Sequence, residues 1–362
     1  MLALTTAAVL SPDRAGEAAG RVWEPFVLVA GLLLVGLVAH GDGVFDAVAG
    51  RLTRTPGGAG HLLVVLLLLT AVVTAVLNLD TSVAFLTPIL VLTARRRGLA
   101  EEPFLYGAVL MSNAASTLLP GSNLTNLLVL HRHSPSGVAF AARMGGAWLM
   151  AVTCTIGVLL VCYRRQLHGP RLTCATTPTA PPARRFGVAT TIAAALLVTL
   201  LRAPALPVFV LGAAAVTARR YGRREIFDAL NPAALLGLYG ISAALGTLAA
   251  AWTGPGRLVA TASQPTTAVV AALAAVMLNN LPAAVLLSTG AVASPEGLLL
   301  GLNLGPNLAV TGSLSAVLWL QSARRIGSQP SLRTFSRLGA ILVPLSLAAC
   351  LATLSVWPIR HF

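Results

Sequence analysis

Charged side chains are scarce in this sequence, and lysine is absent altogether. Only 10% of the 362 residues are charged, whereas soluble proteins average roughly 25%. This scarcity excludes an ordinary soluble domain. All 25 basic residues are arginine, against 11 acidic residues, which gives a net charge of +14. The loops are too short to form a basic domain, so we expect no nucleic-acid binding and assign the arginines to membrane topology.

Cysteine is also rare, and its pattern excludes two kinds of site. Cys154, Cys162, Cys174 and Cys350 are scattered without a C-x-x-C spacing, so we interpret them as small packing residues rather than metal ligands. The pair His131 and His133 lies in a short predicted loop and is expected at the membrane interface. We predict no metal site and no cofactor; H⁺ or Na⁺ would enter only as coupling ions.

Long apolar runs fill the rest of the chain. Hydrophobic residues make up 56% of it, and the mean hydropathy is +0.82. Many runs approach the roughly 20 residues that a helix needs to cross a bilayer, whereas barrel strands would alternate over about 10 residues. The sequence therefore predicts an all-α polytopic protein that passes several times through the cell membrane, with the lipid bilayer as its first partner.

One apolar stretch, Leu62–Thr93, carries the polar residues Asn78–Ser82 at its centre. As one straight helix it would be about 48 Å long, which is too long for one span and too short for two spans with a loop. Arginines flank both ends, at Arg51 and Arg54 and at Arg95–Arg97. Because basic loops stay in the cytoplasm, both ends belong on that side. We predict a re-entrant hairpin.

Three further apolar stretches have polar interruptions. Thr266–Val292 carries Asn279–Pro282 and is predicted to be a second re-entrant hairpin. Phe104–Leu130 is broken at Pro120–Asn126, and Leu298–Leu320 is broken at Gly305–Asn307 and Thr311–Ser313. Proline and glycine interrupt the helix hydrogen bonds, and the freed backbone groups must face a polar cavity. We predict two broken transmembrane helices.

The order of span, hairpin, broken span and span occurs twice. The first hairpin is predicted to open inside and the second outside, so the two copies form an inverted repeat, a design typical of secondary transporters. The predicted division is an extracytoplasmic N-terminal segment at 1–24, a first transporter repeat at 25–163, a cytoplasmic linker at 164–185, an extra helix pair with its loop at 186–232, and a second repeat at 233–362.

The polar tips and breaks supply groups suited to ion binding. Asparagine, serine and threonine offer neutral oxygens and amide donors. A carboxylate at the bilayer centre costs on the order of 3 kcal/mol, so Asp80 calls for a role: it carries a coupling proton, coordinates a cation, or accepts hydrogen bonds at the hairpin tip. The predicted substrate and ion site comprises Asn78, Asp80, Thr81, Ser82, Asn113, Ser116, Gly121, Ser122, Asn123, Thr125, Asn126, Asn279, Asn280, Asn303, Asn307, Thr311, Gly312 and Ser313.

Four segments carry a family resemblance: Asn78–Pro88, Asn113–Asn126, Asn279–Pro282 and Asn303–Ser313. The chain resembles the arsenite permease and sodium/proton antiporter branch of the ion transporter superfamily, which also includes divalent anion:sodium symporters. The resemblance implies a secondary transporter with two hairpins that moves by an elevator or rocking motion. It implies neutral As(OH)₃ or Sb(OH)₃ as cargo, exported against protons, with a homodimer and a separate ATPase subunit as partners.

The sequence departs from the permeases at two places. Leu79 separates Asn78 from Asp80, where permeases usually place the aspartate directly after the asparagine. The pair Phe186–Ala218 has no counterpart in the first half. Two alternatives stay open: a sodium/proton antiporter that uses the same site, and a sodium-coupled importer of dicarboxylates or other anions. We expect no enzyme, because clustered catalytic side chains are missing.

Overall fold

The computed structural model of the chain describes residues 12–52, 57–130, 135–168, 183–201, 203–251 and 254–356. Within these ranges every regular element is a helix and no strand occurs, as the predicted fold class requires. His131, His133, Cys174 and positions 169–182 of the predicted linker lie outside the described residues, and so do positions 1–11 of the N-terminal segment.

The first half begins with an unusually long helix, α2, of 30 residues. It starts at Pro12 and continues through Pro25, so residues 12–24, predicted as a segment outside the membrane, are its first turns. Alanine, glutamate and arginine are good helix formers, which allows the polar segment to extend the apolar one. The helices of this half are α2 (Pro12–Gly41), α3 (Val44–Leu52), α4 (Ala59–Val76), α5 (Leu79–Arg96), α6 (Glu102–Ala115), η1 (Pro120–Ser122), α7 (Leu124–Leu130), α8 (Gly137–Cys162) and α9 (Arg164–Leu167).

The second half repeats the alternation of long helices and short broken ones. The predicted second hairpin is divided at Asn279 into α15 and α16, and the second broken span contains two short 3₁₀ turns. The helices are α10 (Arg185–Leu200), α11 (Ala205–Ala218), α12 (Arg223–Leu230), α13 (Pro232–Ala251), α14 (Gly254–Ala260), α15 (Gln264–Leu278), α16 (Asn280–Leu287), α17 (Pro295–Leu304), η2 (Gly305–Leu308), η3 (Val310–Gly312), α18 (Leu314–Arg325) and α19 (Leu332–Val356).

Several helices are long and apolar enough to cross a membrane. Five such candidates occur within the described ranges: Gly16–Gly41, Ala59–Val76, Gly137–Cys162, Arg223–Leu248 and Leu332–Val356. The helices α10, α11 and α15 are apolar but shorter. A 20-residue helix spans about 30 Å, and the two predicted broken spans are built from shorter pieces that meet at polar breaks.

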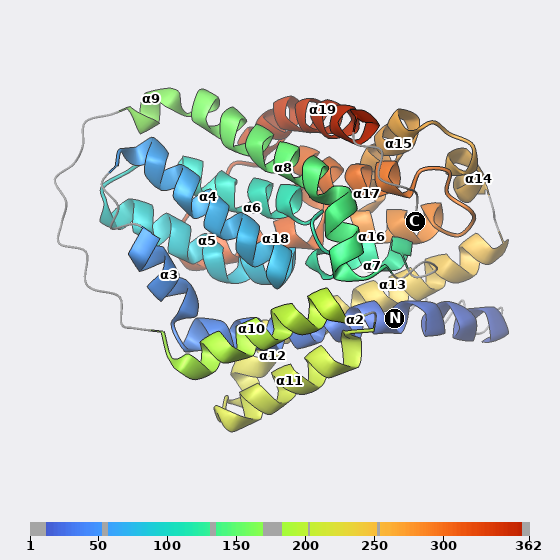
Figure 1. The fold of residues 1–362 in the computed structure, drawn as a ribbon, viewed down its shortest axis with the longest axis horizontal. Coiled ribbons are helices and arrows are strands. Elements are labelled where there is room, and N and C mark those ends of the chain that lie inside the picture. Colours follow the sequence, from blue (N-terminus) through green and yellow to red (C-terminus); the bar gives the residue numbers. More distant parts are fainter. Residues whose placement is uncertain are drawn as a thin grey trace.

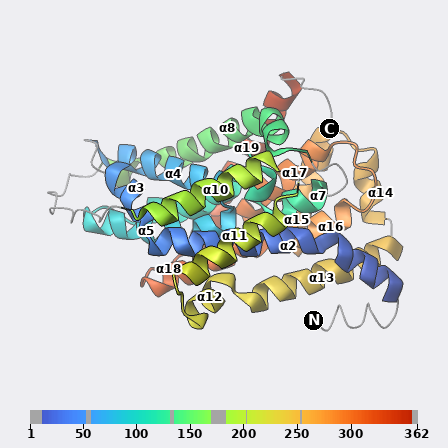
Figure 2. The same cartoon turned by 60° about the horizontal axis from the view of Figure 1, so that its bottom comes forward.

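The helices form two groups that face each other (Figures 1 and 2). One group consists of α2 with α10, α11, α12 and α13, all of which contact α2. The other contains α4 to α8 and α15 to α19, where α5 packs on α6 and α18, and α8 packs on α19. The polar tips and breaks all belong to this second group, so the α2 group covers it from one side.

Glycines allow α2 and α11 to approach closely. A Cβ atom added at Gly31 would lie 2.6 Å from the backbone nitrogen of Phe209, and one added at Gly212 would lie 2.7 Å from the carbonyl oxygen of Gly31. Small residues are the usual means of packing helices in membranes, where the lipid removes the hydrophobic driving force. The predicted extra helix pair is therefore joined to the first helix by direct backbone contact.

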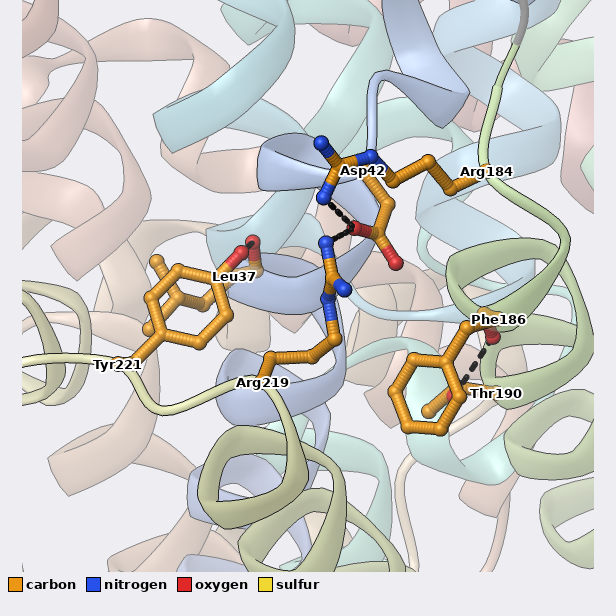
Figure 3. Close-up of polar contacts among 7 residues, drawn as sticks. All are labelled: Leu37, Asp42, Arg184, Phe186, Thr190, Arg219 and Tyr221. Atoms are coloured by element: carbon orange, nitrogen blue, oxygen red, sulfur yellow. Dashed lines mark hydrogen bonds and ion pairs between the residues drawn. The ribbon is translucent and has the colours of Figure 1, made fainter.

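An ion cluster joins the same elements at the C-terminal end of α2 (Figure 3). The carboxylate of Asp42 is fully buried and lies 2.5 Å from Nη2 of Arg219 and 4.0 Å from Nη1 of Arg184. The backbone N–H of Arg184 donates to the carbonyl of Asp42 at 2.9 Å, and the Tyr221 hydroxyl donates to the carbonyl of Leu37 at 3.3 Å. Both ends of the α10–α11 pair are thereby fixed to α2.

Arginines from several helices gather at this end of the molecule. Arg95, from the last turn of α5, donates to the carbonyl of Ile326 at 2.6 Å and to Oγ of Ser328 at 2.9 Å, which brings the basic end of α18 beside it. α3 and α9 also lie toward this end, whereas α14 lies at the opposite one (Figure 1). We call it the arginine-rich end.

Candidate functional site

The tip of the first hairpin is an asparagine cap. Oδ1 of Asn78 accepts a hydrogen bond of 2.7 Å from the backbone N–H of Thr81, and the Asn78 backbone is extended at φ 169° and ψ 175°. Asparagine is among the best residues at this position. Asn78 lies between α4 and α5 and caps α5, so Asp80, Thr81 and Ser82 fall in the first turn of α5.

The tip of the second hairpin has a similar cap. Asn279 has a positive φ of 82° with ψ 149°, a backbone conformation that residues other than glycine rarely adopt. Its Oδ1 accepts from the N–H of Leu281 at 3.3 Å, and its Nδ2 donates to the carbonyl of Thr311 at 3.1 Å. Asn280, the first residue of α16, is buried. Pro282 fits there because the first turn needs no backbone donor.

The two broken helices share one backbone geometry. In the first, extended residues Leu119 and Asn123 enclose the short turn η1. In the second, extended residues Ala309 and Ser313 enclose η3. The first break makes one 3₁₀ turn, η1, before a new helix begins, and the second makes two, η2 and η3. The residues on either side of η1 and η3 have similar extended backbone angles, although the turns themselves differ in sequence.

Asn303 of α17 reaches into the first break. Its Oδ1 accepts from Nδ2 of Asn123 at 2.6 Å and from Oγ of Ser116 at 2.6 Å. Its Nδ2 donates to Oδ1 of Asn126 at 2.8 Å and to the carbonyl of Leu299 at 2.7 Å. The side chain is fully buried, and all of its hydrogen-bonding capacity is used within the protein.

Asn113 of α6 makes the reciprocal contact with the second broken helix. Its Nδ2 donates to Oδ1 of Asn307 at 2.8 Å, and its Oδ1 accepts from Oγ of Ser315 at 3.2 Å. Asn307 in turn donates to the carbonyl of Leu110 at 3.2 Å. Asparagines from each broken helix thus fill the hydrogen-bonding needs of the other. We call these contacts, centred on Asn113 and Asn303, the amide network.

The remaining predicted residues of the breaks have local partners. Oγ of Ser122 accepts from the N–H of Leu119 at 3.0 Å and donates to the carbonyl of Ala75 in α4 at 3.2 Å. Ser313 caps α18 and shares a hydrogen bond of 2.8 Å with Ser315. Gly312 packs against Pro306. These contacts position the breaks against the hairpins.

Several polar atoms near the first hairpin have no partner. Nδ2 of Asn78 and the hydroxyls of Thr74, Thr81 and Thr125 are buried and form no hydrogen bond within the described residues. A buried polar group without a partner costs about 1–3 kcal/mol. Such groups are rare in native proteins and call for an explanation such as a bound solute or a functional role.

Asp80 belongs to this unpaired set. Its side chain is only 8% exposed, and no hydrogen bond or ion pair joins it to another described residue. It lines a cavity of about 580 Å³ between α2, α5, α12 and α18, together with Leu37, Phe85 and Ser322. A second cavity of about 250 Å³ lies farther toward the N-terminus of α2, beside Leu28 and the predicted residue Gly121.

The structure therefore separates the predicted set into three parts. Asn113, Ser116, Asn123, Asn126, Asn303 and Asn307 satisfy one another in the amide network. Asn78, Asp80, Thr81 and Thr125 carry unpaired groups, while Ser82 shares a hydrogen bond of 3.3 Å with Ser112. Asn279 and Thr311 bond with each other on the exposed side of the second hairpin, and no hydrogen bond among the described residues joins them to the first hairpin.

Sequence reasoning missed three participants. Ser112 precedes Asn113 and reaches Ser82, Ser315 reaches Asn113, and the unpaired hydroxyl of Thr74 lies four residues before Asn78. Each is a small hydroxyl residue within one helical turn of a predicted residue, and that spacing was the available signal. In the described part of the chain, no three His, Cys, Asp or Glu side chains come together as a metal site would require.

Comparisons with known proteins agree with this architecture. A family model described as citrate transporter, CitMHS, matches residues 1–316. The crystal structure of the YdaH transporter of Alcanivorax borkumensis shares the fold, with a TM-score of 0.56 and 17% identity, over 94% of this chain and 87% of that one.

Two relatives match in sequence over shorter segments. An uncharacterised transporter of Mycobacterium tuberculosis is 28% identical over 142 residues, which cover 39% of this chain and 33% of that protein. An arsenical pump membrane protein of Yersinia enterocolitica is 26% identical over 150 residues, covering 40% and 35%. These matches span about a third of the relatives' length. They support the predicted resemblance to the ion transporter superfamily. The chain belongs to the citrate transporter family, CitMHS, and is a multi-pass protein of the cell membrane.

Proposed function

We propose that this chain is a secondary active transporter that exports arsenite or antimonite in exchange for protons. The observation that carries the proposal is Asp80, a buried carboxylate at a hairpin tip that has no partner among the described residues and lines a cavity of about 580 Å³. An isolated carboxylate in a membrane marks a proton or ion pathway more often than a structural element. Asp80 is the group to which we assign the coupling proton.

The cargo would bind among the unpaired neutral groups. Nδ2 of Asn78 is a donor, and the hydroxyls of Thr74, Thr81 and Thr125 donate or accept. An uncharged trihydroxy solute such as As(OH)₃ offers matching hydroxyls and needs no countercharge. The name of the Yersinia relative, an arsenical pump membrane protein, supports this cargo. In this proposal the amide network holds the two broken helices together and does not touch the cargo.

The orientation follows from the arginines. The positive-inside rule assigns the arginine-rich end to the cytoplasm. The larger cavity then opens to the cytoplasm. The two predicted hairpins and the inverted repeat are also part of the proposal. A homodimer and an ATPase subunit remain predictions that rest on the resemblance alone.

A sodium/proton antiporter is the second candidate, because an unpaired carboxylate in a cavity is also a cation ligand. A sodium-coupled importer of citrate or another carboxylate is the third, and the family description favours it. It is opposed by the carboxylate of Asp80, which would repel an anionic cargo.

Everted membrane vesicles with an imposed pH gradient distinguish these functions. We expect arsenite to accumulate in vesicles with an acidic interior, and Asp80→Asn to abolish this accumulation at an unchanged protein level. Sodium movement under the same gradient, with no arsenite uptake, would assign the antiporter. Citrate transport that requires sodium would assign the importer. Vesicles from cells that lack the chain provide the background.

A further inference from the structure

The mouth of the larger cavity is formed by a short helix whose residues are all at least partly exposed. α12, Arg223–Leu230, has no buried residue, and its residues Glu225 and Phe227–Leu230 line the cavity. Glu225 and Asp228 both line it and are exposed. They are three residues apart, so they lie on one face of the helix. The facing wall is α18, with Gln321, Ser322 and Arg325.

The lining of this cavity is net negative, whereas the whole chain is net positive. The protein has 25 basic and 11 acidic residues, yet the charged residues lining the cavity are Asp80, Glu225, Asp228 and Arg325. Arg223 and Arg224 begin the same helix but are not part of the lining. Three carboxylates and one guanidinium leave the cavity net negative. Narrow clefts with apolar walls focus such a field and raise the local concentration of ions of opposite sign.

Asp80 supplies an independent sign that a ligand reaches this cavity, because it is more than nine-tenths buried, unpartnered and part of the lining.

The two acids at the mouth differ in role. Oε2 of Glu225 accepts a hydrogen bond of 2.8 Å from the backbone N–H of Gly222 and so caps α12. Asp228 has no hydrogen bond or ion pair with any described residue, and its charge is available to solutes.

We propose that Asp228, with Glu225, forms a cation-collecting entrance between α12 and α18 through which a monovalent cation, H⁺ or Na⁺, exchanges between the arginine-rich side and Asp80. The inference deepens the proposed function and rests on Asp80 being the coupling group. It predicts that the entrance admits small cations far better than anions of equal size, although the protein surface around it is strongly basic.

Labelling of a cysteine inside the cavity tests the entrance without measuring transport. The four native cysteines are replaced by alanine, Asp80→Cys is introduced, and the protein is reacted in membranes with a cationic and an anionic thiosulfonate of similar size. Rates are normalised to those of a free thiol. We expect the cationic reagent to react about ten-fold faster and Asp228→Arg to remove this preference. High salt should also reduce it.

Asp46→Arg is the matched control. Asp46 is an exposed carboxylate on α3 and does not line the cavity, so the preference should survive the same change of charge there. If Asp80→Cys is not recovered in folded form, Ser322→Cys reports on the same cavity. Equal rates for both reagents, or a preference unchanged by Asp228→Arg, would overturn the proposal. If Asp228→Arg removes the preference and Asp46→Arg does not, the entrance is supported. This result does not depend on arsenite uptake by the vesicles, so the labelling assay and the uptake assay can fail independently.

Discussion

The side-chain amide of Asn113 donates to that of Asn307 at 2.8 Å, although the two residues are 194 positions apart in the chain. The contact joins α6 of the first broken helix to η2 of the second. Asn303 makes the corresponding contact in the other direction, with Asn123 and Asn126. Two broken helices with freed backbone groups are thus held by reciprocal amides, which fix their relative position while the first hairpin keeps unpaired groups.

Asn303→Leu should destabilise the protein through this network. The change leaves Nδ2 of Asn123 and Oδ1 of Asn126 without this partner, whereas Oγ of Ser116 keeps its hydrogen bond to the carbonyl of Asn113. Hydrogen bonds in membrane proteins average about 0.6 kcal/mol, but stranded buried groups cost about 1–3 kcal/mol each. We expect a loss of about 2 kcal/mol or more, measured by thermal unfolding in detergent.

Thr87→Val is the control for that measurement. The Thr87 hydroxyl is buried and has no partner within the described part of the chain, so replacing it with a methyl group removes an unsatisfied group without a large change in volume. We expect stability to be unchanged or raised. Equal destabilisation by Asn303→Leu and Thr87→Val would mean that the loss of stability does not come from the amide network.

Asp42→Asn should loosen the α10–α11 pair. The carboxylate is fully buried beside Arg219, and breaking a buried pair typically costs about 3–5 kcal/mol. Arg219 is 28% exposed, so we expect less, about 2 kcal/mol, in the same unfolding assay. Arg184→Gln should have a small effect because Arg184 is largely exposed and 4.0 Å away. The double variant Asp42→Asn with Arg219→Gln should lose less stability than the sum of the losses in the two single variants.

Gly31→Ala should separate α2 from α11. The added Cβ would lie 2.6 Å from the backbone of Phe209, and backbone cannot move aside as a flexible side chain can. Gly237→Ala in α13 is the comparison, because nothing lies within 4 Å of its added Cβ, and alanine favours a helix by about 1 kcal/mol. We expect a lower unfolding temperature for the first variant and no loss for the second. Comparable losses would contradict the close crossing.

The helix breaks could be predicted because their causes are local. Asn78 and Asn279 cap the helices that follow them, and Pro120 and Pro306 interrupt the broken spans. The extent of α2 was underestimated, since residues 12–24 look polar and only the folded chain shows them as helix.

The division of the site between satisfied and unpaired groups could not be predicted. Asn126 and Asn78 are the same residue type in similar motifs, yet Asn126 bonds to Asn303, 177 positions away, while Nδ2 of Asn78 has no partner. Asp42 was missed for the same reason: it lies between two glycines, and its partner Arg219 is 177 positions away. One sequence shows which groups are polar, but pairing depends on contacts between distant segments.

Moving the carboxylate by one residue is the sharpest test of the site. Arsenite permeases usually place the aspartate directly after the first-hairpin asparagine, whereas here Leu79 follows Asn78. The double variant Leu79→Asp with Asp80→Leu recreates the permease order. Leu79 is only 2% exposed and does not line the cavity, so the moved charge would be buried away from the cavity.

We expect the double variant to lose proton-driven arsenite uptake in everted vesicles. Its stability should also fall, since an unpaired charge would enter the apolar core. Asp80→Glu keeps the carboxylate at the cavity and should retain part of the uptake, which separates a misplaced charge from a damaged fold. Full uptake in the double variant would show that the carboxylate works from either position, and the assignment of coupling to the cavity beside α12 would then fail.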